Sequence, residues 1–240
     1  MGFIDMHSHI LPDIDDGSEN IEQTINMLKI AYEEGIRTVV ATSHYYQGRF
    51  EEPATVLRER LTDVRNSIAN TLPEMNLYLG SEIYYSHESI QLLKQGTIPT
   101  IADTRYILVE FSPLAEYLYL KRGLQTFILE GYSPILAHVE RYENVIKNID
   151  RVLELIDMGV YMQVNAMSIT GEMGRGYQEI TKRLLKNLCV HIVATDAHSI
   201  RIRAPRMKKC YEMVSKKYGK VYANELFMDN QLRILKNQYI

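Results

Sequence analysis

The stretch Phe3-Ile-Asp-Met-His-Ser-His9 decides the fold. Residues 3–6 are predicted to form a strand, and two histidines follow at its end. Because residues two apart on an extended chain point to the same side, His7 and His9 can bind one metal ion together. The chain therefore begins with a strand that carries chemically active side chains at its carboxyl end.

Beyond this stretch, the chain alternates short β-branched runs with longer segments of helical periodicity. This alternation is typical of parallel strands that are joined by crossover helices. We expect six further strands, at residues 36–42, 77–83, 106–111, 133–137, 160–164 and 190–194. The first helix should have Ser18 as its N-cap and Gly35 at its C-terminal end. Later helices are expected near residues 53–72, 86–95, 114–131, 142–158, 177–188, 205–218 and 230–239.

The composition limits the class of protein. The chain has 240 residues, of which 46% are hydrophobic, and no linker-like segment, so we expect a single domain over residues 1–240. A formal net charge of -3 gives no basic excess for binding nucleic acid or anionic membranes. No apolar run approaches the roughly 18 residues of a transmembrane segment. With only two cysteines, the chain is expected to be a cytoplasmic protein without disulfides.

Polar side chains follow six of the seven predicted strands. In an α/β barrel the carboxyl ends of the strands converge on one mouth, where the reacting groups collect. The imidazoles and carboxylates at these positions are His7, His9, His44, Glu82, Glu110, His138, Asp196 and His198, with the pair Asp15-Asp16 in the first loop. Five of the seven histidines lie at strand ends, whereas His87 and His191 are interpreted as structural.

Glu110 and Asp196 follow apolar runs, where a carboxylate is costly to bury unless it is paired or coordinated. Buried salt bridges with Arg141 or Arg203 would account for these two carboxylates. They would leave the strand-end histidines unexplained. The residues themselves therefore favour a metal-dependent phosphoester hydrolase.

Two other phosphate chemistries lack their residues. A cysteine-dependent phosphatase needs arginine six residues after the thiolate, but Thr195 follows Cys189 and Lys216 follows Cys210 at that spacing. The glycines of the segment 171–176 are in the wrong order for a nucleotide-binding loop, and Tyr177 stands where such a loop has lysine.

Taken together, the motifs resemble the PHP (polymerase and histidinol phosphatase) metallohydrolases, and within them the manganese-dependent protein-tyrosine phosphatases of bacterial capsule and exopolysaccharide loci. The resemblance covers the whole chain. The motifs that carry it are Ile4-Asp-Met-His-Ser-His-Ile-Leu-Pro12, Asp15-Asp-Gly17, Thr42-Ser-His44, Gly80-Ser-Glu-Ile-Tyr-Tyr85, Glu110-Phe111, Ala137-His-Val-Glu-Arg141 and Asp196-Ala-His198 with Arg203. It implies a distorted (β/α)7 barrel of PHP type that holds three divalent metal ions.

The same resemblance implies how the ligands are divided. His7, His9, Glu82 and Asp196 would hold the first ion; Glu82, Glu110 and His138 the second; and Asp16, His44 and His198 the third. Manganese is the expected metal, with iron or zinc as alternatives. The carboxylates Asp16 and Glu110 favour the tyrosine-phosphatase branch. Ser8 departs from the commonest branch pattern, which has cysteine, but supplies no ligand.

Such a metal cluster suits the hydrolysis of phosphomonoesters. A water bridging two ions ionises near a pKa of about 7 and would be the nucleophile. Arg141 and Arg203 are the candidates for binding phosphate oxygens, because a guanidinium group matches them bidentately. Tyr45-Tyr46 and Tyr84-Tyr85 could form an apolar wall for an aryl ring, although packing is the commoner role for such residues.

The implied substrate is a phosphotyrosine protein, specifically the tyrosine-rich tail of a cytoplasmic kinase that controls polysaccharide export. The first alternative is a histidinol-phosphate phosphatase, or another small-molecule phosphatase, of the same family. A second is a catalytically silent metal-binding module, which would be expected to have broken ligand positions. A PHP exonuclease would need a basic strip that the chain lacks.

Overall fold

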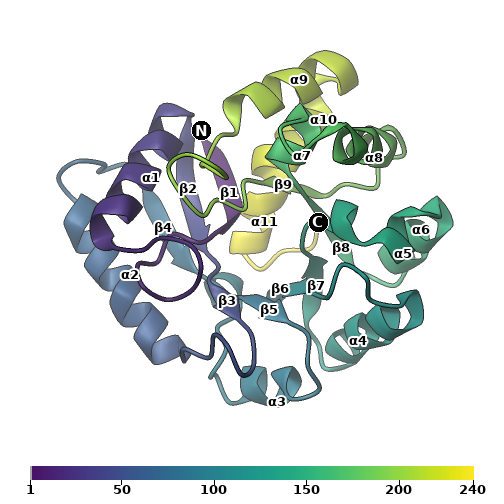
Figure 1. The fold of residues 1–240 in the computed structure, drawn as a ribbon, viewed down its shortest axis with the longest axis horizontal. Helices are drawn as coiled ribbons and strands as arrows, with labels where there is room; N and C mark the ends of the chain where they lie inside the picture. The colour runs from purple at the N-terminus through teal and green to yellow at the C-terminus, as the bar shows by residue number, and fades with distance from the viewer. Residues whose placement is uncertain (1) are drawn as a thin grey trace.

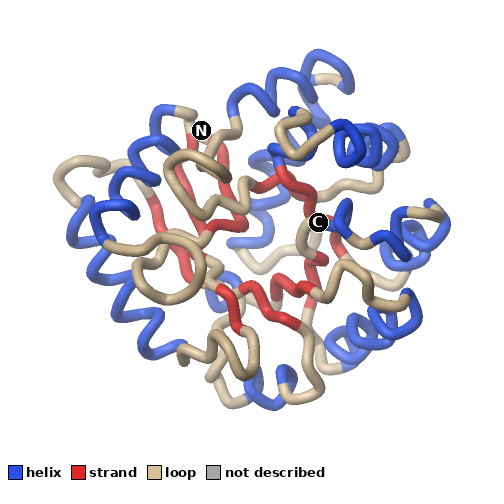
Figure 2. The backbone as a smooth tube through the Cα atoms, in the orientation of Figure 1, coloured by secondary structure: helices blue, strands red, loops and turns tan. Residues whose placement is uncertain are grey.

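Parallel strands curve around a common interior in the computed structural model, which describes residues 2–240 (Figure 1). One sheet has the order β1 (Phe3–Ser8), β2 (Ile36–Ala41), β4 (Asn76–Leu79). The other has the order β3 (His44–Tyr45), β5 (Glu82–Tyr84), β6 (Tyr106–Glu110), β7 (Ser133–Leu136), β8 (Tyr161–Asn165), β9 (Ile192–Ala194). Figure 2 shows the strands at the centre and the helices around them.

The chain after β9 returns to β1 and closes the ring. The backbone N–H of Asp196 donates to His7 O at 2.8 Å, and that of His9 donates to Ala197 O at 2.8 Å. Buried Asp5 adds a side-chain link, because its carboxylate accepts from both the N–H and the hydroxyl of Thr195. The predicted α/β barrel is therefore confirmed.

The expected strand 77–83 is divided into β4 and β5, which corrects that range, and the expected strand 36–42, which β2 reproduces to within one residue, is followed by the unexpected short strand β3. At Thr42 the chain bonds back to β1, since its N–H donates to Ser8 O at 2.9 Å, and β3 begins only at His44. The neighbouring strand is interrupted at the same level of the barrel, because β4 ends at Leu79 and β5 begins at Glu82. At these two points the chain passes from the sheet of β1 to the sheet of β6, so nine strands among residues 2–240 take the place of the seven expected.

The helices of the structure are α1 (Ile21–Glu33), α2 (Ala54–Ile68), α3 (Ser89–Lys94), α4 (Tyr117–Leu129), α5 (Glu143–Ile146), α6 (Ile149–Asp157), α7 (Ala166–Thr170), α8 (Arg175–Lys186), α9 (Lys208–Tyr218), α10 (Lys220–Asn224) and α11 (Asn230–Leu235). Most of them lie close to the predicted ranges, whereas α7 and α10 were not expected. Among the described residues 2–240, no helix is both long enough and apolar enough to cross a membrane.

Three details of the helix prediction were wrong. Asn20, not Ser18, caps α1, because its side chain accepts from the N–H of Gln23, whereas the Ser18 hydroxyl bonds to Asn20 O. The expected helix 142–158 is divided because Asn148 caps a new helix. Helix α7 was not expected, and α11 continues from α10 through a π-turn at Glu225–Asp229. Gly35 does follow the end of α1, with a φ of +91° that favours glycine.

Alternate residues of the strands serve two cores. Tyr106 and Leu108 of β6 pack inside the barrel, where Ile234 of α11 joins them, whereas Ile107 and Val109 pack beneath the helices. This period of two carries through to the strand ends. Glu110 therefore continues the inward row, and a polar site is placed on top of the interior core.

Candidate metal centre

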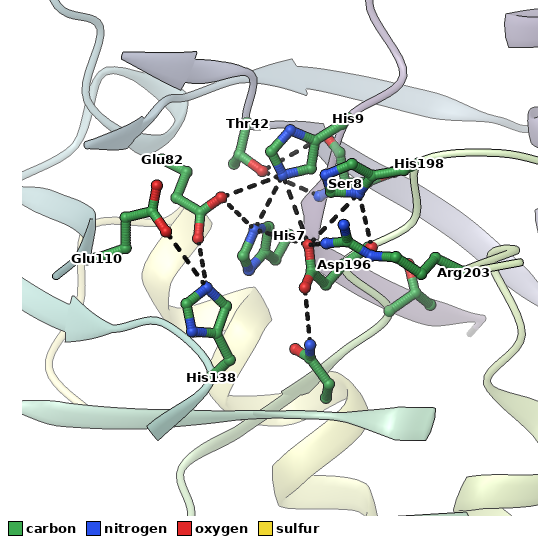
Figure 3. A network of polar contacts seen from close by, with 12 residues as sticks. His7, Ser8, His9, Thr42, Glu82, Glu110, His138, Asp196, His198 and Arg203 are labelled. Atoms are coloured by element: carbon green, nitrogen blue, oxygen red, sulfur yellow. Dashed lines mark hydrogen bonds and ion pairs between the residues drawn. The ribbon is translucent and has the colours of Figure 1, made fainter. Parts of the chain in front are cut away.

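All nine predicted ligand residues converge at the carboxyl ends of the strands. They come from β1 or its following loop (His7, His9, Asp16), β3 (His44), β5 (Glu82), β6 (Glu110), the turn after β7 (His138) and the loop after β9 (Asp196, His198). Figure 3 shows most of these side chains pointing toward one another around Glu82 and Asp196. Their role as metal ligands remains a prediction.

The most deeply buried group consists of His7, His9, Glu82 and Asp196, whose potential ligand atoms all lie within 4.8 Å of one another. The Nε2 atoms of His7 and His9 are 3.2 Å apart, and each is close to Glu82 Oε2, at 3.1 and 3.2 Å. Nitrogen and carboxylate atoms that face one point suit a divalent cation. This group has the membership that the resemblance implies for the first ion.

Two further groups adjoin the first. One contains His9, Asp16, His44 and His198, and the other contains His44, Glu82 and Glu110. His44 belongs to both, because its Nδ1 is 3.0 Å from Glu110 Oε1 and its Nε2 is 3.5 Å from Asp16 Oδ1.

His138 lies on the other side of the same carboxylates. Its Nε2 is 2.8 Å from Glu82 Oε1 and 3.7 Å from Glu110 Oε2. The structure therefore brings together the residues of the second and third implied groups, with His44 positioned between them.

Buried nitrogen atoms without hydrogen-bond partners test whether these residues fit a metal. Among the described residues, His198 Nε2 is buried and makes no hydrogen bond, and the nearby Asp16 Oδ1 is 3.6 Å away. His44 Nδ1 also makes no hydrogen bond of good geometry, although Glu82 Oε2 and Glu110 Oε1 lie 3.2 and 3.0 Å from it. Leaving a buried nitrogen without a partner is costly, whereas coordination would satisfy it. The donor set of imidazoles and carboxylates is compatible with manganese, iron or zinc. The residues present therefore fit a group of divalent ions.

Asp15 holds the imidazole of His9 in position. His9 Nδ1 donates to Asp15 Oδ2 at 2.8 Å, and the same oxygen accepts from His44 N at 2.8 Å. This bond fixes the His9 tautomer and leaves Nε2 facing Glu82. The sequence presents Asp15 and Asp16 as an undivided pair, and only the structure separates their roles.

Two amides on β8 support the site, although this strand carries no predicted ligand. Gln163 Oε1 accepts from His7 Nδ1 at 3.1 Å and from His138 N at 2.8 Å. Asn165 Nδ2 donates to Asp196 Oδ2 at 2.8 Å, and its own Oδ1 accepts from Gln163 Nε2. Neither amide was predicted from the sequence to take part in the site. The available signal was the alternation of polar and apolar residues in 161–165.

The charges of the site are strongly coupled. Burial would raise the pKa of Glu82, but the positive charges of His7 and His44 outweigh it and hold that pKa well below its usual range. Burial lowers the pKa values of the two histidines, but nearby carboxylates, Glu82 foremost, raise them to about 9 for His7 and about 10 for His44. Without metal, protonated imidazoles therefore balance the buried carboxylates.

Arg141 and Arg203 both contact Asp196. Arg141 Nη2 donates to Asp196 Oδ2 at 3.0 Å, and Arg203 Nη2 donates to Asp196 Oδ1 at 2.5 Å. Both side chains remain partly exposed, by 23% and 28%, and line the cavity above the candidate ligands. The salt bridges that were the alternative interpretation are thus present for Asp196, where they coexist with the convergent histidines. They are not seen for Glu110, whose charged contacts among the described residues are with His44 and His138.

The cavity has a volume of about 270 Å³. Besides candidate ligands and the two arginines, its lining includes Tyr46, Tyr84, Arg49 and Phe50. Neither Arg49 nor Phe50 was predicted from the sequence to lie at the site. A larger cavity, of about 1030 Å³, has Gly2, Glu34 and Arg37 in its lining but none of the nine candidate ligands, so we place the chemistry in the smaller one.

Comparison with known proteins agrees with this geometry. Residues 3–236 match the family described as capsular polysaccharide synthesis, CpsB/CapC. The tyrosine-protein phosphatase CpsB of Streptococcus pneumoniae is 38% identical over 242 residues, covering 99% of this chain and 100% of that protein. Tyrosine-protein phosphatase YwqE of Bacillus subtilis is 29% identical, covering 99% of this chain and 93% of that protein.

Solved structures agree at the level of the fold. A crystal structure described as that of YwqE from Bacillus subtilis and CpsB from Streptococcus pneumoniae, unique metal-dependent tyrosine phosphatases, has a TM-score of 0.93 at 29% identity and covers 99% of this chain and 96% of that one. The phosphotriesterase homology protein of Escherichia coli has a TM-score of 0.65 at 12% identity, covering 98% of each chain, which is a similarity of fold alone.

Proposed function

Because the chain belongs to the CpsB/CapC family of capsular polysaccharide synthesis, we propose that it is a metal-dependent protein-tyrosine phosphatase. The reaction is the hydrolysis of a phosphoric monoester. The observation that carries the proposal is the convergence of nine imidazole and carboxylate side chains beneath a cavity that two arginines line. The relatives named as tyrosine-protein phosphatases support the choice of substrate.

The metal site would be formed by the nine convergent residues, and we propose three divalent ions, manganese before iron or zinc. Bound divalent ions supply positive charge for a phosphate group and activate water for attack. The side chains set up the site before any ion binds. Asp15 and Gln163 fix the outer nitrogens of His9 and His7, so that both imidazoles present Nε2 to Glu82.

Arg141 and Arg203 would bind the phosphate oxygens. Each uses one Nη2 atom to contact Asp196 at the base of the cavity, and a guanidinium group has further N–H donors. Asp196 and Glu140 help to keep Arg141 protonated, since their negative charges outweigh burial and raise its pKa. The contact with Asp196 thus holds both guanidinium groups where they could donate hydrogen bonds to a phosphate above the candidate ligands.

The attacking group would be water, because the described residues offer no suitable thiolate. Cys189 and Cys210 are both buried, and neither lines the cavity. Burial raises the pKa of both thiols, which disfavours the reactive thiolate. A phenolate leaves with a pKa near 10 and needs limited proton donation, which suits a site that relies on charge stabilisation.

The proposed partner is a phosphotyrosine protein, in particular the tyrosine-rich tail of a kinase of the polysaccharide pathway. The family match to capsular polysaccharide synthesis supports this assignment. A kinase whose tail lies in the cytoplasm would require the phosphatase to be cytoplasmic as well. We propose residues 1–240 as a single catalytic domain.

Two experiments test the alternatives, a histidinol-phosphate phosphatase and a catalytically silent metal-binding module. Hydrolysis of a phosphotyrosine peptide and of histidinol phosphate is compared as kcat/KM on one metal-loaded preparation. A large preference for the peptide is expected, and a preference for histidinol phosphate would overturn the proposed substrate.

The second experiment uses His138→Ala, which removes a nitrogen 2.8 Å from Glu82. Turnover should fall by roughly 100-fold or more if the residue is a ligand. His87→Ala, at an exposed histidine away from the nine residues, is the matched control. Equal turnover in the two variants would favour the silent metal-binding module, with the observed activity coming from a contaminant.

A further inference from the structure

Two tyrosines stand at the mouth of the cavity, one step beyond two candidate ligands. In the register of β3 with β5, His44 pairs with Glu82 and Tyr45 with Ile83. The next residues along are Tyr46 and Tyr84, and their rings stack with centroids 4.1 Å apart and planes 7° from parallel. Because residues two apart share a face, this pair continues the row of His44 and Glu82 toward solvent.

The neighbouring tyrosines have a different role. Tyr45 and Tyr85 are each only 6% exposed and belong to the core beneath the helices. Tyr85 stacks there on Phe111. Of the four tyrosines that the sequence placed near the site, Tyr46 and Tyr84 alone line the cavity. The packing role therefore applies to one pair and leaves the other without a structural explanation.

A short turn holds the tyrosine pair against the metal site. Tyr46 and Phe50 exchange backbone hydrogen bonds of 2.7 and 2.8 Å. The Phe50 ring stacks on His44, with a centroid distance of 5.9 Å and an angle of 13° between the planes. The Arg49 guanidinium lies over Phe50, 4.8 Å from its centroid. The aromatic side chains at the mouth are thus fixed relative to the residues beneath them.

The height of the tyrosine pair above the candidate ligands matches an aryl phosphate. Two residues along a strand span about 7 Å, so the tyrosine pair lies roughly that far above the level of His44 and Glu82. If the phosphate oxygens of a bound phosphotyrosine lie at the level of the arginines and candidate ligands, its ring lies beside Tyr46 and Tyr84. A phosphoserine would have to bring its main chain to that level, where its N–H and C=O groups would lose water without gaining partners.

We propose that Tyr46, Tyr84 and Phe50 form an aryl-binding wall that selects phosphate esters of aromatic alcohols over those of serine or threonine. The proposal rests on the proposed phosphatase function and names the residues that set its specificity. These side chains position the substrate and take no part in proton transfer or ligation.

The test compares two peptides of identical sequence that carry phosphotyrosine or phosphoserine at one position. Tyr46→Leu and Tyr84→Leu remove the stacking surface, and Tyr46→Phe and Tyr84→Phe keep it. The ratio of kcat/KM for phosphotyrosine over phosphoserine should fall about three- to tenfold in each leucine variant and stay near the wild-type value in each phenylalanine variant. Tyr239→Leu, at an exposed ring outside the cavity, is the matched control.

A ratio measured on one preparation does not depend on differences in folding or metal content between variants. A binding measurement removes the dependence on turnover as well. Calorimetry with benzylphosphonate and ethylphosphonate should show an aryl preference in the wild type that decreases in the leucine variants.

The outcomes separate the two proposals. If the wild type hydrolyses phosphotyrosine but the leucine substitutions leave both the substrate ratio and the phosphonate ratio unchanged, the aryl-binding wall is wrong and the phosphatase function stands. If the metal-loaded wild type hydrolyses neither peptide, the proposed function fails, and the wall as a determinant of substrate choice fails with it.

Discussion

His9 Nδ1 donates to Asp15 Oδ2 at 2.8 Å, and His9 Nε2 lies 3.2 Å from Glu82 Oε2 on the opposite side of the ring. The Asp15 carboxylate therefore holds the imidazole through Nδ1, while the Glu82 carboxylate lies with Nε2 at the candidate metal site. A histidine held in this way is typical of metal sites, because the rear carboxylate fixes the tautomer and increases the basicity of the ligating nitrogen.

Asp15→Asn should weaken metal binding by roughly 10- to 100-fold, because it removes the negative charge behind His9. Competition with a chelator of known affinity measures the change. Asp13→Asn is the control, since Asp13 is exposed in the same loop and asparagine tolerates its φ of +58°. Equal metal affinity in both variants would show that Asp15 only shapes the loop.

Gln163→Leu should destabilise the folded protein by about 2 to 6 kcal/mol. The substitution leaves His7 Nδ1 and His138 N without their acceptor, and each buried donor without a partner costs about 1 to 3 kcal/mol. Urea denaturation of the metal-free protein measures the free energy of unfolding. An unchanged transition midpoint would contradict the hydrogen-bonding role assigned to this amide.

Metal binding should release protons at neutral pH. With pKa values raised to about 9 and about 10, His7 and His44 are protonated at pH 7 in the metal-free protein. Ligation requires neutral imidazoles, so roughly two protons should leave when metal binds, and the apparent affinity should increase with pH. Calorimetry in buffers of different ionisation enthalpy counts the protons. Binding without proton release would contradict the raised pKa values of His7 and His44 in the metal-free protein.

The same pKa values predict how stability depends on pH in the metal-free protein. Because both folded-state values exceed the ordinary histidine value of 6.5, protonation of His7 and His44 stabilises the folded state fully below about pH 6.5. That contribution is lost as the pH increases through 9 and 10. Thermal melting between pH 6 and 10 should show a decrease in the metal-free protein, and His7→Gln should reduce its slope.

Arg203→Lys should lower kcat/KM for a phosphotyrosine peptide by roughly tenfold or more, because lysine keeps the charge but not the bidentate fork. Inhibition by inorganic phosphate should weaken in parallel. Arg201→Lys, at an exposed arginine of the same loop, should leave both quantities unchanged. If phosphate inhibition is the same in all three proteins, Arg203 serves only to pair with Asp196.

The sequence predicted the barrel because the alternation of strands and helices is visible in the local pattern of apolar and polar residues. It did not predict the break after Leu79 inside the expected strand 77–83, or the short strand β3 beyond the expected end at Thr42, because both depend on pairing with distant strands. The first N-cap was placed at Ser18 instead of Asn20 because both residue types favour that position.

The polar cluster was predictable because its residues follow strands and the fold brings strand ends together, whereas the choice of nine ligands within it came from the family resemblance. Gln163 and Asn165 were not predictable, because an amide inside a strand has the pattern of ordinary alternation, and its partners come from distant residues. The division of the tyrosines into a core pair and a cavity pair likewise became visible only with the register of β3 and β5.

Hydrolysis of a phosphotyrosine peptide before and after removal of metal tests the central claim most directly. Chelation should abolish turnover, and re-addition of manganese should restore it in the wild type but not in His138→Ala. Turnover that persists after chelation would contradict the account. So would a folded, chelated protein whose turnover is not restored by manganese, iron or zinc.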